Sequence, residues 1–393
     1  MRTIYLDNGA TTIVDEAVIK AMLPYMNDKY GNASSTHHKG QEAKMALEES
    51  RDVIAKSIGA RYDEIIFTSG GTESNNFAIK GIAFANKAKG NHIITTDIEH
   101  DCIQNACKWL ETQGFKVTYL NVDKEGFVNP VELEKAITSK TILFSAIHGN
   151  NEIGTLQDLD SLGKICRKHN VLFHIDACQS YTKTDINVKK HNLDMMTMNS
   201  HKIHGPKGVG ALYLRKGIKI TPLLHGGGHE HNLRSGTENV SGVVGFAKAV
   251  KLAGSSHIKQ MTKLRDYMIE NLMKIQDTML NGPEGDKRLC NNVNISFLYV
   301  EGESIGAYLD AKGICSSTGS ACSSRSLEPS HVLIAIGRKP EEAHGSLRLT
   351  ISRFTTKEEV EILLKELPPI ITKLRKMSPL GRKDPCSSDA GGW

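Results

Sequence analysis

The chain has 393 residues, of which 39% are hydrophobic and 24% charged, and its formal net charge is +5. This length exceeds the size at which one hydrophobic core keeps growing, so we expect two domains packed together. The charges form no run that resembles a nucleic-acid footprint, and no stretch approaches the roughly 20 apolar residues of a membrane span. The start, MRTIYLDNGATT, has no apolar core of a signal peptide. We therefore expect a cytoplasmic protein without a direct nucleic-acid or membrane partner.

The eight cysteines are too sparse for a disulfide scaffold, and none of them forms a CxxC pair for zinc. We expect most of them, about six, to be buried and reduced thiols. The eight are Cys102, Cys107, Cys166, Cys178, Cys290, Cys315, Cys322 and Cys386.

Seven short β-rich runs alternate with helical patterns between about residues 60 and 215. The runs are EIIFT, NHIITT, FKVTYL, TILFSAI, VLFHIDA, DMMTM and GALYL. This rhythm predicts an α/β fold with a mostly parallel seven-stranded sheet and helices on both faces. Ligands of such sheets bind outside the carboxyl ends of the strands, so the polar residues that follow the runs should converge on one rim.

The remaining chain predicts a smaller α+β domain. After a helical stretch from about Val240 to Met279 come VNISFLYV, a helix, GICSS, SLRLTIS and a final helix from Lys357. We expect a large domain at residues 16–250 and a small domain made of residues 1–15 and 251–380. The polar, glycine-rich tail at 381–393 should be loose.

The segment IIFTSGGTESNN predicts a strand, a glycine turn and a helix. It places Gly71 and Thr72 at a helix N-terminus, where free N–H groups and the helix dipole suit a phosphate. A tight structural turn with Thr72 as a cap explains the same pattern, and that alternative stays open. The spacing is not that of a nucleotide P-loop.

The segment HIDACQS ends an apolar run with Asp176. A carboxylate at a strand end can pair with a protonated pyridine nitrogen. A metal hydrolase is the alternative, because His174 shares a strand face with Asp176 and His201 and His204 could add ligands. No HExxH motif or three-ligand cluster accompanies them.

Lys202 follows the next run in Ser200-His201-Lys202, ahead of a glycine-rich turn. A lysine at a strand end can be desolvated, which lowers its pKa and makes it a competent Schiff-base former. Taken alone, most lysines are surface residues, and that alternative is the commoner one. A phosphate turn, a strand-end aspartate and a following lysine are together the three anchors that a pyridoxal-phosphate (PLP) ring requires.

With these three anchors, the chain resembles the cysteine desulfurases of the NifS/IscS type, in the class V aminotransferase group of fold-type I PLP enzymes. The resemblance covers nearly the whole chain. The matching segments are YLDNGATT, YGNASSTHHKG, FTSGGTESNN, IEHDC, GNNEIGT, HIDACQS, SHKIHGPKGVGALYLR, GGGHEHNLRSGTENV, NNVNISF, SSTGSACSSRSLEPSHVL and LRLTISRFTT.

The resemblance implies a role around the PLP ring for four residues. Lys202 would attach PLP as a Schiff base, and Asp176 would pair with the pyridine nitrogen. Gln179 would bond the phenolic oxygen. His100 would stack on the ring and help to move protons.

The resemblance also implies which residues hold the phosphate. They are Gly71 and Thr72 in the turn, His201, and Thr237 from a neighbouring subunit, which would make the protein an obligate homodimer. The family usually has serine where this chain has Asn199. An asparagine still donates to phosphate, so we expect a retained but altered PLP affinity.

For the substrate, L-cysteine, the resemblance implies that Asn151 and Arg348 hold the carboxylate and that Cys322 receives the sulfur as a persulfide. Cys322 lies in a run of small polar residues, which predicts a solvent-reachable thiol. A free surface thiol is the plain alternative. The long loop before Ser330 and His331 resembles the NifS/IscS group rather than the SufS group.

The implied function is a cysteine desulfurase that releases L-alanine and passes sulfur to an iron–sulfur scaffold protein or another acceptor, for cluster assembly or tRNA thiolation. No resident metal is expected, although Cys322 could contact an iron–sulfur cluster transiently on a scaffold. The alternatives are a PLP enzyme acting on selenocysteine or cysteine sulfinate, and a non-catalytic scaffold with the same fold.

Overall fold

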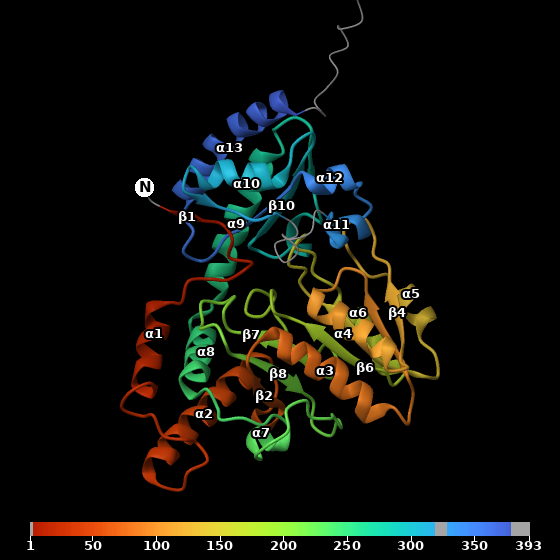
Figure 1. Cartoon of the computed structure of the whole chain (residues 1–393), viewed down its shortest axis with the longest axis vertical. Helices are drawn as coiled ribbons and strands as arrows, with labels where there is room; N and C mark the ends of the chain where they lie inside the picture. The colour runs from red at the N-terminus through yellow and green to blue at the C-terminus, as the bar shows by residue number, and fades with distance from the viewer. Residues whose placement is uncertain (1–2, 319–327, 379–393) are drawn as a thin grey trace, which may run out of the picture.

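The computed structural model describes residues 3–318 and 328–378. Its largest element is a seven-stranded sheet flanked by helices (Figure 1). In spatial order the strands are β2 (Ile65–Thr68), β8 (Gly210–Leu214), β7 (Met195–Asn199), β6 (Leu172–Asp176), β5 (Thr141–Ile147), β3 (His92–Thr96) and β4 (Lys116–Leu120). Each predicted run forms one of these strands, so the predicted α/β fold is confirmed.

The directions of the strands determine where a ligand can bind. β8 runs antiparallel to both of its neighbours, β2 and β7, whereas the other pairings in the sheet are parallel. The carboxyl ends of β2, β3, β5, β6 and β7 therefore meet at one edge of the sheet. Loops that leave this edge carry polar residues toward a common space.

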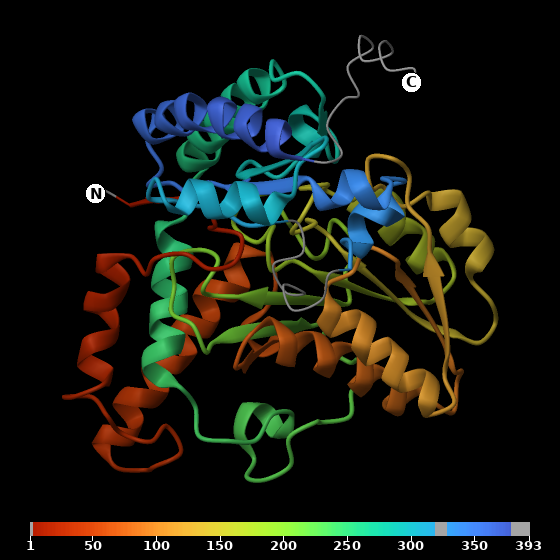
Figure 2. The same ribbon diagram turned by 45° about the horizontal axis from the view of Figure 1, so that its top comes forward.

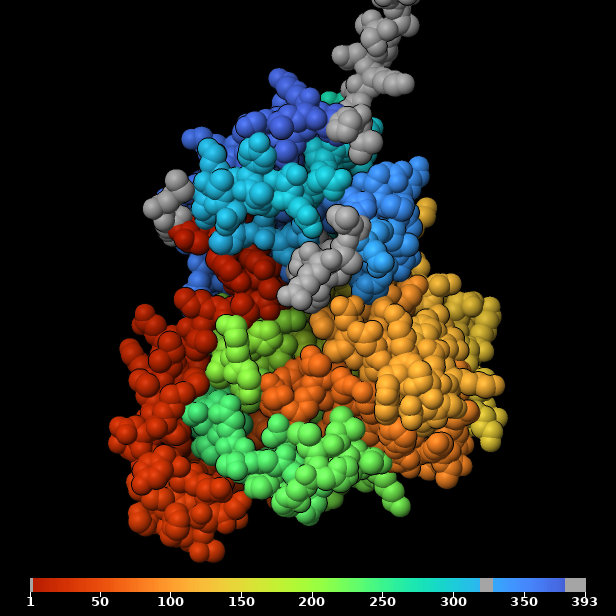
Figure 3. Space-filling view, viewed as in Figure 1, coloured from red at the N-terminus to blue at the C-terminus, as the bar shows by residue number. Residues whose placement is uncertain are grey.

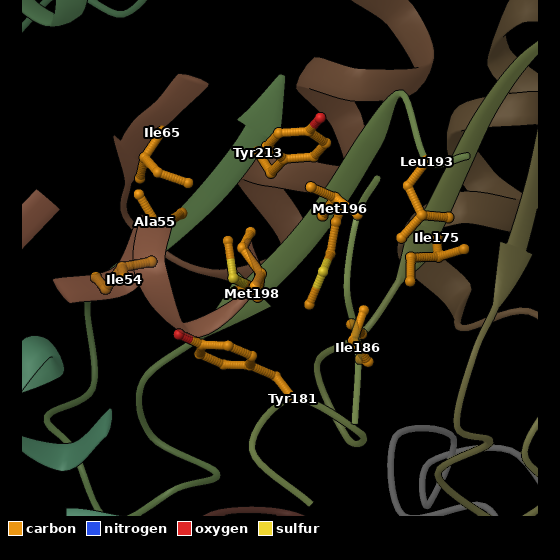
Figure 4. Close-up of a cluster of buried hydrophobic side chains, with 14 of the residues drawn as sticks. Ile54, Ala55, Ile65, Ile175, Tyr181, Ile186, Leu193, Met196, Met198 and Tyr213 are labelled. Carbon is orange, nitrogen blue, oxygen red and sulfur yellow. The ribbon is translucent and has the colours of Figure 1, made fainter. Parts of the chain in front are cut away.

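Side chains alternate between the two faces of the sheet, as the pleat of a strand requires. On β7, Met196 and Met198 pack with Ile54 of α2 and Tyr213 of β8 on one face (Figure 4), while Met195 packs on the other. Apolar residues of α2, α6 and α8 cover the first face and those of α3 and α4 cover the second. Both faces are thus buried, which explains why the runs are almost wholly apolar.

The helices of this part follow the chain order of the strands. They are α1 (Glu16–Met22), α2 (His38–Ser57), α3 (Gly71–Asn86), α4 (Asp101–Thr112), α5 (Pro130–Ala136), α6 (Leu159–Lys168), α7 (His229–Asn232) and α8 (Val240–Leu252), with 3-10 turns η1 (Leu23–Tyr25) and η2 (Tyr62–Glu64).

A second group of elements gathers at one end of the molecule (Figures 1 and 2). Its sheet has the order β12-β10-β9, and the N-terminal strand β1 pairs with β11. These strands are β1 (Ile4–Tyr5), β9 (Thr278–Leu280), β10 (Asn292–Phe297), β11 (Ile314–Cys315) and β12 (Ser346–Thr350). The accompanying helices are α9 (Ser255–Leu272), η3 (Gly285–Lys287), α10 (Gly302–Asp310), α11 (His331–Ala335), α12 (Pro340–His344) and α13 (Lys357–Met377).

This second group has its own cluster of buried apolar residues, from Ile4 and Leu6 to the face of α13. The separate cluster supports the proposed division into two domains. The loose tail predicted at 381–393 lies outside the described residues.

The helical stretch predicted from Val240 to Met279 is wrong in its extent. The chain leaves the helix at Ala253 and Gly254, whose backbones are extended, and a new helix begins at Ser255. Glycine favours such a break because it has no side chain to restrict its backbone. Thr278 to Leu280 then form a strand, because they pair with β10.

The six cysteines in the described part of the chain are all free thiols. Four of them are buried, namely Cys107, Cys166, Cys178 and Cys290, and two are half-buried, Cys102 and Cys315. Cys322 and Cys386 lie outside the described residues. Among the described helices, none combines the length and the apolar character that crossing a membrane needs.

Candidate active site

A cavity of about 260 Å³ lies at the carboxyl edge of the large sheet. It reaches from the start of α3 to Arg348 on β12, so both groups of elements contribute to its wall. Ten of the twelve predicted site residues line it. They are Gly71, Thr72, His100, Asn151, Asp176, Gln179, Asn199, His201, Lys202 and Arg348.

Two predicted site residues are not placed in the cavity. Thr237 lies in an exposed segment after α7 and is absent from the described lining. Its predicted role requires a second subunit, so it stays a prediction. Cys322 lies outside the described residues, and its role stays a prediction too.

The phosphate turn joins β2 to α3. Gly70 has φ +154°, and a side chain at Gly71 would place its Cβ 2.6 Å from the sulfur of Cys178. Only glycine fits at Gly71 without moving its neighbours, and the backbone there stays bare. The N-terminus of the 16-residue helix α3 thus presents free N–H groups and a partial positive charge to the cavity.

Asp176 is held in place by two hydrogen bonds. The side-chain amide of Asn75 donates to its Oδ2 at 2.7 Å, and the backbone N–H of Cys178 donates to its Oδ1 at 2.8 Å. The carboxylate is 4% exposed, so water does not compete for these bonds. Such fixation suits a group that must meet one ring nitrogen in a set orientation.

The sequence reasoning did not identify Asn75 or Cys102 as site residues. Both line the cavity, and the amide of Asn75 also donates to the sulfur of Cys102 at 3.2 Å. One signal was present in the sequence: Asn75 lies four residues after Gly71, so the two share a face of α3. Cys102 offered no comparable signal.

His100 is a neutral imidazole with a defined tautomer. Its Nδ1 accepts a hydrogen bond from the backbone N–H of Cys102 at 3.2 Å and lies 3.1 Å from the Cys102 sulfur. The proton of the neutral ring is therefore on Nε2. Burial, and next the positive charge of Lys202, lower the pKa of His100. The same two causes lower the pKa of His201 to about 4.

Arg348, on β12, supplies a buried positive charge to the wall of the cavity. Its Nη1 donates to the backbone oxygen of Asn151 at 3.2 Å, and its Nη2 lies 3.0 Å from a carboxylate oxygen of Asp7. Its Nε is buried and has no hydrogen-bond partner among the described residues. A buried N–H of a guanidinium requires an acceptor, and a ligand carboxylate is a suitable one.

The metal-site alternative gains no support from the contacts of His174. One ring nitrogen lies 2.8 Å from the hydroxyl of Ser145 and the other 3.0 Å from that of Thr197. Burial lowers the pKa of His174 to about 4, so the ring is neutral. His174 is thus a hydrogen-bonded core residue behind the cavity wall.

Residues 4–363 match the model of the family described as aminotransferase class-V, and the chain belongs to this family. The chain is similar to the cysteine desulfurase IscS of Dictyoglomus turgidum, with 53% identity over 382 residues that cover 96% of this chain and 97% of the relative. It is 52% identical over 387 residues to the cysteine desulfurase IscS of Methanosarcina thermophila, covering 98% and 95% of the two chains.

Two solved structures are similar over most of the chain. A NifS-like protein has 38% identity and a TM-score of 0.89, and the match covers 95% of this chain and 100% of the other. A structure described as SspA in complex with cysteine has 36% identity and a TM-score of 0.81, covering 90% and 100%. The resemblance to the NifS/IscS type is therefore confirmed.

Enzymes of this family generally depend on PLP, and the cavity fits that cofactor. Asn199 lines the cavity, and its side-chain nitrogen lies 3.6 Å from the position that a Cβ at Gly71 would take, so this amide can donate to a phosphate at the turn. The bare backbone at Gly71 and the partial positive charge at the start of α3 suit the same group.

Proposed function

We propose that this protein is a PLP-dependent cysteine desulfurase, which converts L-cysteine to L-alanine and transfers the sulfur to Cys322 as a persulfide. The observation that carries the proposal is the single cavity that brings together Lys202, Asp176 and Arg348. The relatives named cysteine desulfurase support the same activity. PLP, when bound, supplies an electron sink for the negative charge that develops at the substrate Cα.

Lys202 and Asp176 are the residues that would hold PLP at its reactive end. Lys202 would hold it covalently, and the amine of this lysine is the base that can take up the Cα proton of the substrate. Asp176 would pair with the pyridine nitrogen, and its bonds to Asn75 and Cys178 prevent the carboxylate from turning away. Gln179 would bond the phenolic oxygen, and its amide donates to the backbone oxygen of Gly9 at 2.8 Å.

The phosphate is held by the amides of Gly71 and Thr72, by His201 and by the amide of Asn199. The N-terminus of α3 adds its partial charge. Thr237 of a second copy completes the site. Because the charge of the α3 terminus is fixed in the fold, it contributes whether Asn or Ser occupies position 199.

The substrate is oriented by its carboxylate. Arg348 offers its unpaired Nε to one oxygen, and Asn151 contacts the same group. His100 faces the reacting atoms through Nε2, because Nδ1 is occupied by Cys102. A neutral imidazole in that position can give up or receive a proton during the reaction.

Sulfur transfer requires a thiolate. The sulfur of Cys322 bonds to the sulfur of the substrate, the carbon–sulfur bond breaks, and protonation of the carbon leaves alanine. The described thiols in the cavity wall are unsuited to this step. Burial raises the pKa of Cys102 to about 12 and raises the pKa of Cys178 well above its usual value, so both thiols stay protonated at neutral pH.

A homodimer is supported by an apolar surface near α1. Ile13, Leu23, Met26 and Tyr30 are 69%, 53%, 59% and 71% exposed in the single chain. Residues 13–30 belong to the part of the chain that is coloured red in Figure 3. Exposed apolar patches of this kind mark association sites, and a second copy of the chain covers it here. The final acceptor is an iron–sulfur scaffold or a tRNA-thiolation relay in the cytoplasm.

The test uses purified protein loaded with PLP and given L-cysteine. We expect alanine to form, and mass spectrometry to find one added sulfur on the peptide that contains Cys322. The Cys322→Ala variant should bind PLP and cysteine but release only background alanine. The proposal is refuted if wild type forms no alanine, or if Cys322→Ala forms it at the normal rate.

A further inference from the structure

The chain just after Cys322 is attached to the cavity wall through buried contacts. Ser330, eight residues after Cys322 in the sequence (330 minus 322), donates a hydrogen bond to a carboxylate oxygen of Glu152 at 2.5 Å. Nε2 of His331 donates to the backbone oxygen of Glu99 at 3.0 Å. Ser330 and Glu152 are both only 5% exposed, so water does not weaken their bond.

Helix α11 continues this attachment with apolar contacts. Its residues Val332 and Leu333 are 1% and 0% exposed. They pack in one cluster with Ile147, the last residue of β5, and with Ile98 and Ile153 in the loops at the carboxyl edge of the large sheet. We call Ser330, His331 and the buried face of α11 the α11 anchor.

Each contact of the α11 anchor lies beside a residue of the cavity wall. Glu99 precedes His100, and Glu152 follows Asn151, while Ile147 itself lines the cavity. The contacts therefore tie the α11 anchor to the same loops that carry His100 and Asn151. Burial of Val332 and Leu333 already stabilises the packing of α11, so its packing does not depend on the hydrogen bonds of Ser330 and His331.

The other end of the segment is also fixed. The backbones of Ser317 and Arg348 exchange two hydrogen bonds, of 3.2 and 2.7 Å, so this end lies against the strand that carries the substrate-binding arginine. Cys322 is five positions after Ser317 in the sequence (322 minus 317). The chain can span at most about 18 Å over that length.

We propose that Ser330 and His331 are positioning residues for sulfur transfer, which hold the end of the Cys322 segment in register with the loops of His100 and Asn151. This proposal rests on the proposed function. The hydroxyl of Ser330 acts through Glu152 and not on the substrate. Its loss should slow the delivery of the Cys322 thiol and leave the binding of PLP and cysteine unchanged.

The experiment compares Ser330→Ala, Ser330→Thr and wild type as PLP-loaded enzymes. In Ser330→Ala, we expect kcat and the rate of sulfur addition to Cys322 to fall about 3- to 10-fold, the factor expected for loss of one hydrogen bond to a partly ionised group, because burial raises the pKa of Glu152 to about 7. The spectral change on adding cysteine should be unchanged. Ser330→Thr retains the hydroxyl and should recover most of the rate.

Thr356→Ala is the matched control. Ser330 and Thr356 both cap a helix through the side-chain oxygen, but Thr356 caps α13 and is exposed. Thr356→Ala should lose the stability of one helix cap and keep its activity. The proposal is overturned if Ser330→Ala transfers sulfur at the wild-type rate, if it loses the spectral change as well, or if Thr356→Ala is equally slow. Failure of wild type to form alanine would instead reject the proposed function.

Discussion

Replacing Glu230 by alanine should destabilise the protein strongly, because it breaks a buried ion pair. Arg51 and Glu230 are joined by two hydrogen bonds of 2.6 and 2.8 Å, and both side chains are 2% exposed. Burial by itself lowers the pKa of Arg51, but the bonds from Glu230 outweigh it and raise that pKa. Glu230 also accepts the backbone N–H of Phe67 at 2.8 Å, on the strand that leads into the phosphate turn.

The alanine variant leaves the Arg51 charge and the Phe67 amide without this partner. Breaking a buried pair costs about 3–5 kcal/mol, of which an unsatisfied buried amide accounts for about 1–3 kcal/mol. Glu48, 3.4 Å from Nε of Arg51, limits the loss, because it stays as a counter-ion. We therefore expect a loss near the lower end of the range.

The assay is urea unfolding followed by circular dichroism, at one protein concentration and with PLP in excess. The double variant Arg51→Met with Glu230→Met is the control, because replacing a whole buried pair by apolar groups is often neutral. It should recover the part of the loss that comes from the unpaired Arg51 charge, whereas the Phe67 amide stays without its partner. A decrease of less than about 1 kcal/mol in the free energy of unfolding of Glu230→Ala would refute the reasoning, since an unpaired buried charge destabilises a protein by more than that.

Four further outcomes can be measured directly. Lys202→Ala should fold but hold no covalent cofactor and turn over no cysteine, and full activity would reject its assignment. Asp176→Ala should lose PLP or leave it inert, so exchange of the Cα proton, followed by NMR, should stop. Cys322→Ala should keep the spectral change with cysteine while sulfide release falls to background. Burial raises the pKa of Glu99 to about 8. Its stabilising effect is complete below the unfolded pKa near 4.5 and is lost as pH rises through 8, so Glu99→Gln should flatten the fall in the urea midpoint between pH 5 and 8.

The elements that the sequence predicted well are those with a local signal. Most of the seven strands are rich in apolar residues because both faces of the sheet are covered, and the final helix begins where predicted because Thr356 and Glu359 form a capping box. Gly71, Asp176 and Lys202 could be placed together because each lies at or just after the carboxyl end of a strand that points toward the same edge of the sheet. The break at Gly254 was missed, because the helical pattern on its two sides is similar and a single glycine is a weak signal.

The residues that the sequence could not place are those whose role depends on contacts between distant segments. Asn75 stands 27 residues before Cys102 and 101 before Asp176, yet its one amide group donates to both side chains. No period within α3 predicts which partners this face of the helix meets, because the partners come from β6 and from the start of α4. The contact has a chemical consequence. Cys102 also bonds to Nδ1 of His100, so Asn75 and Cys102 link the carboxylate of Asp176 to the imidazole of His100. The two residues proposed to contact the cofactor ring are therefore positioned by one shared network, and a substitution at Asp176 is expected to change the position of the His100 ring.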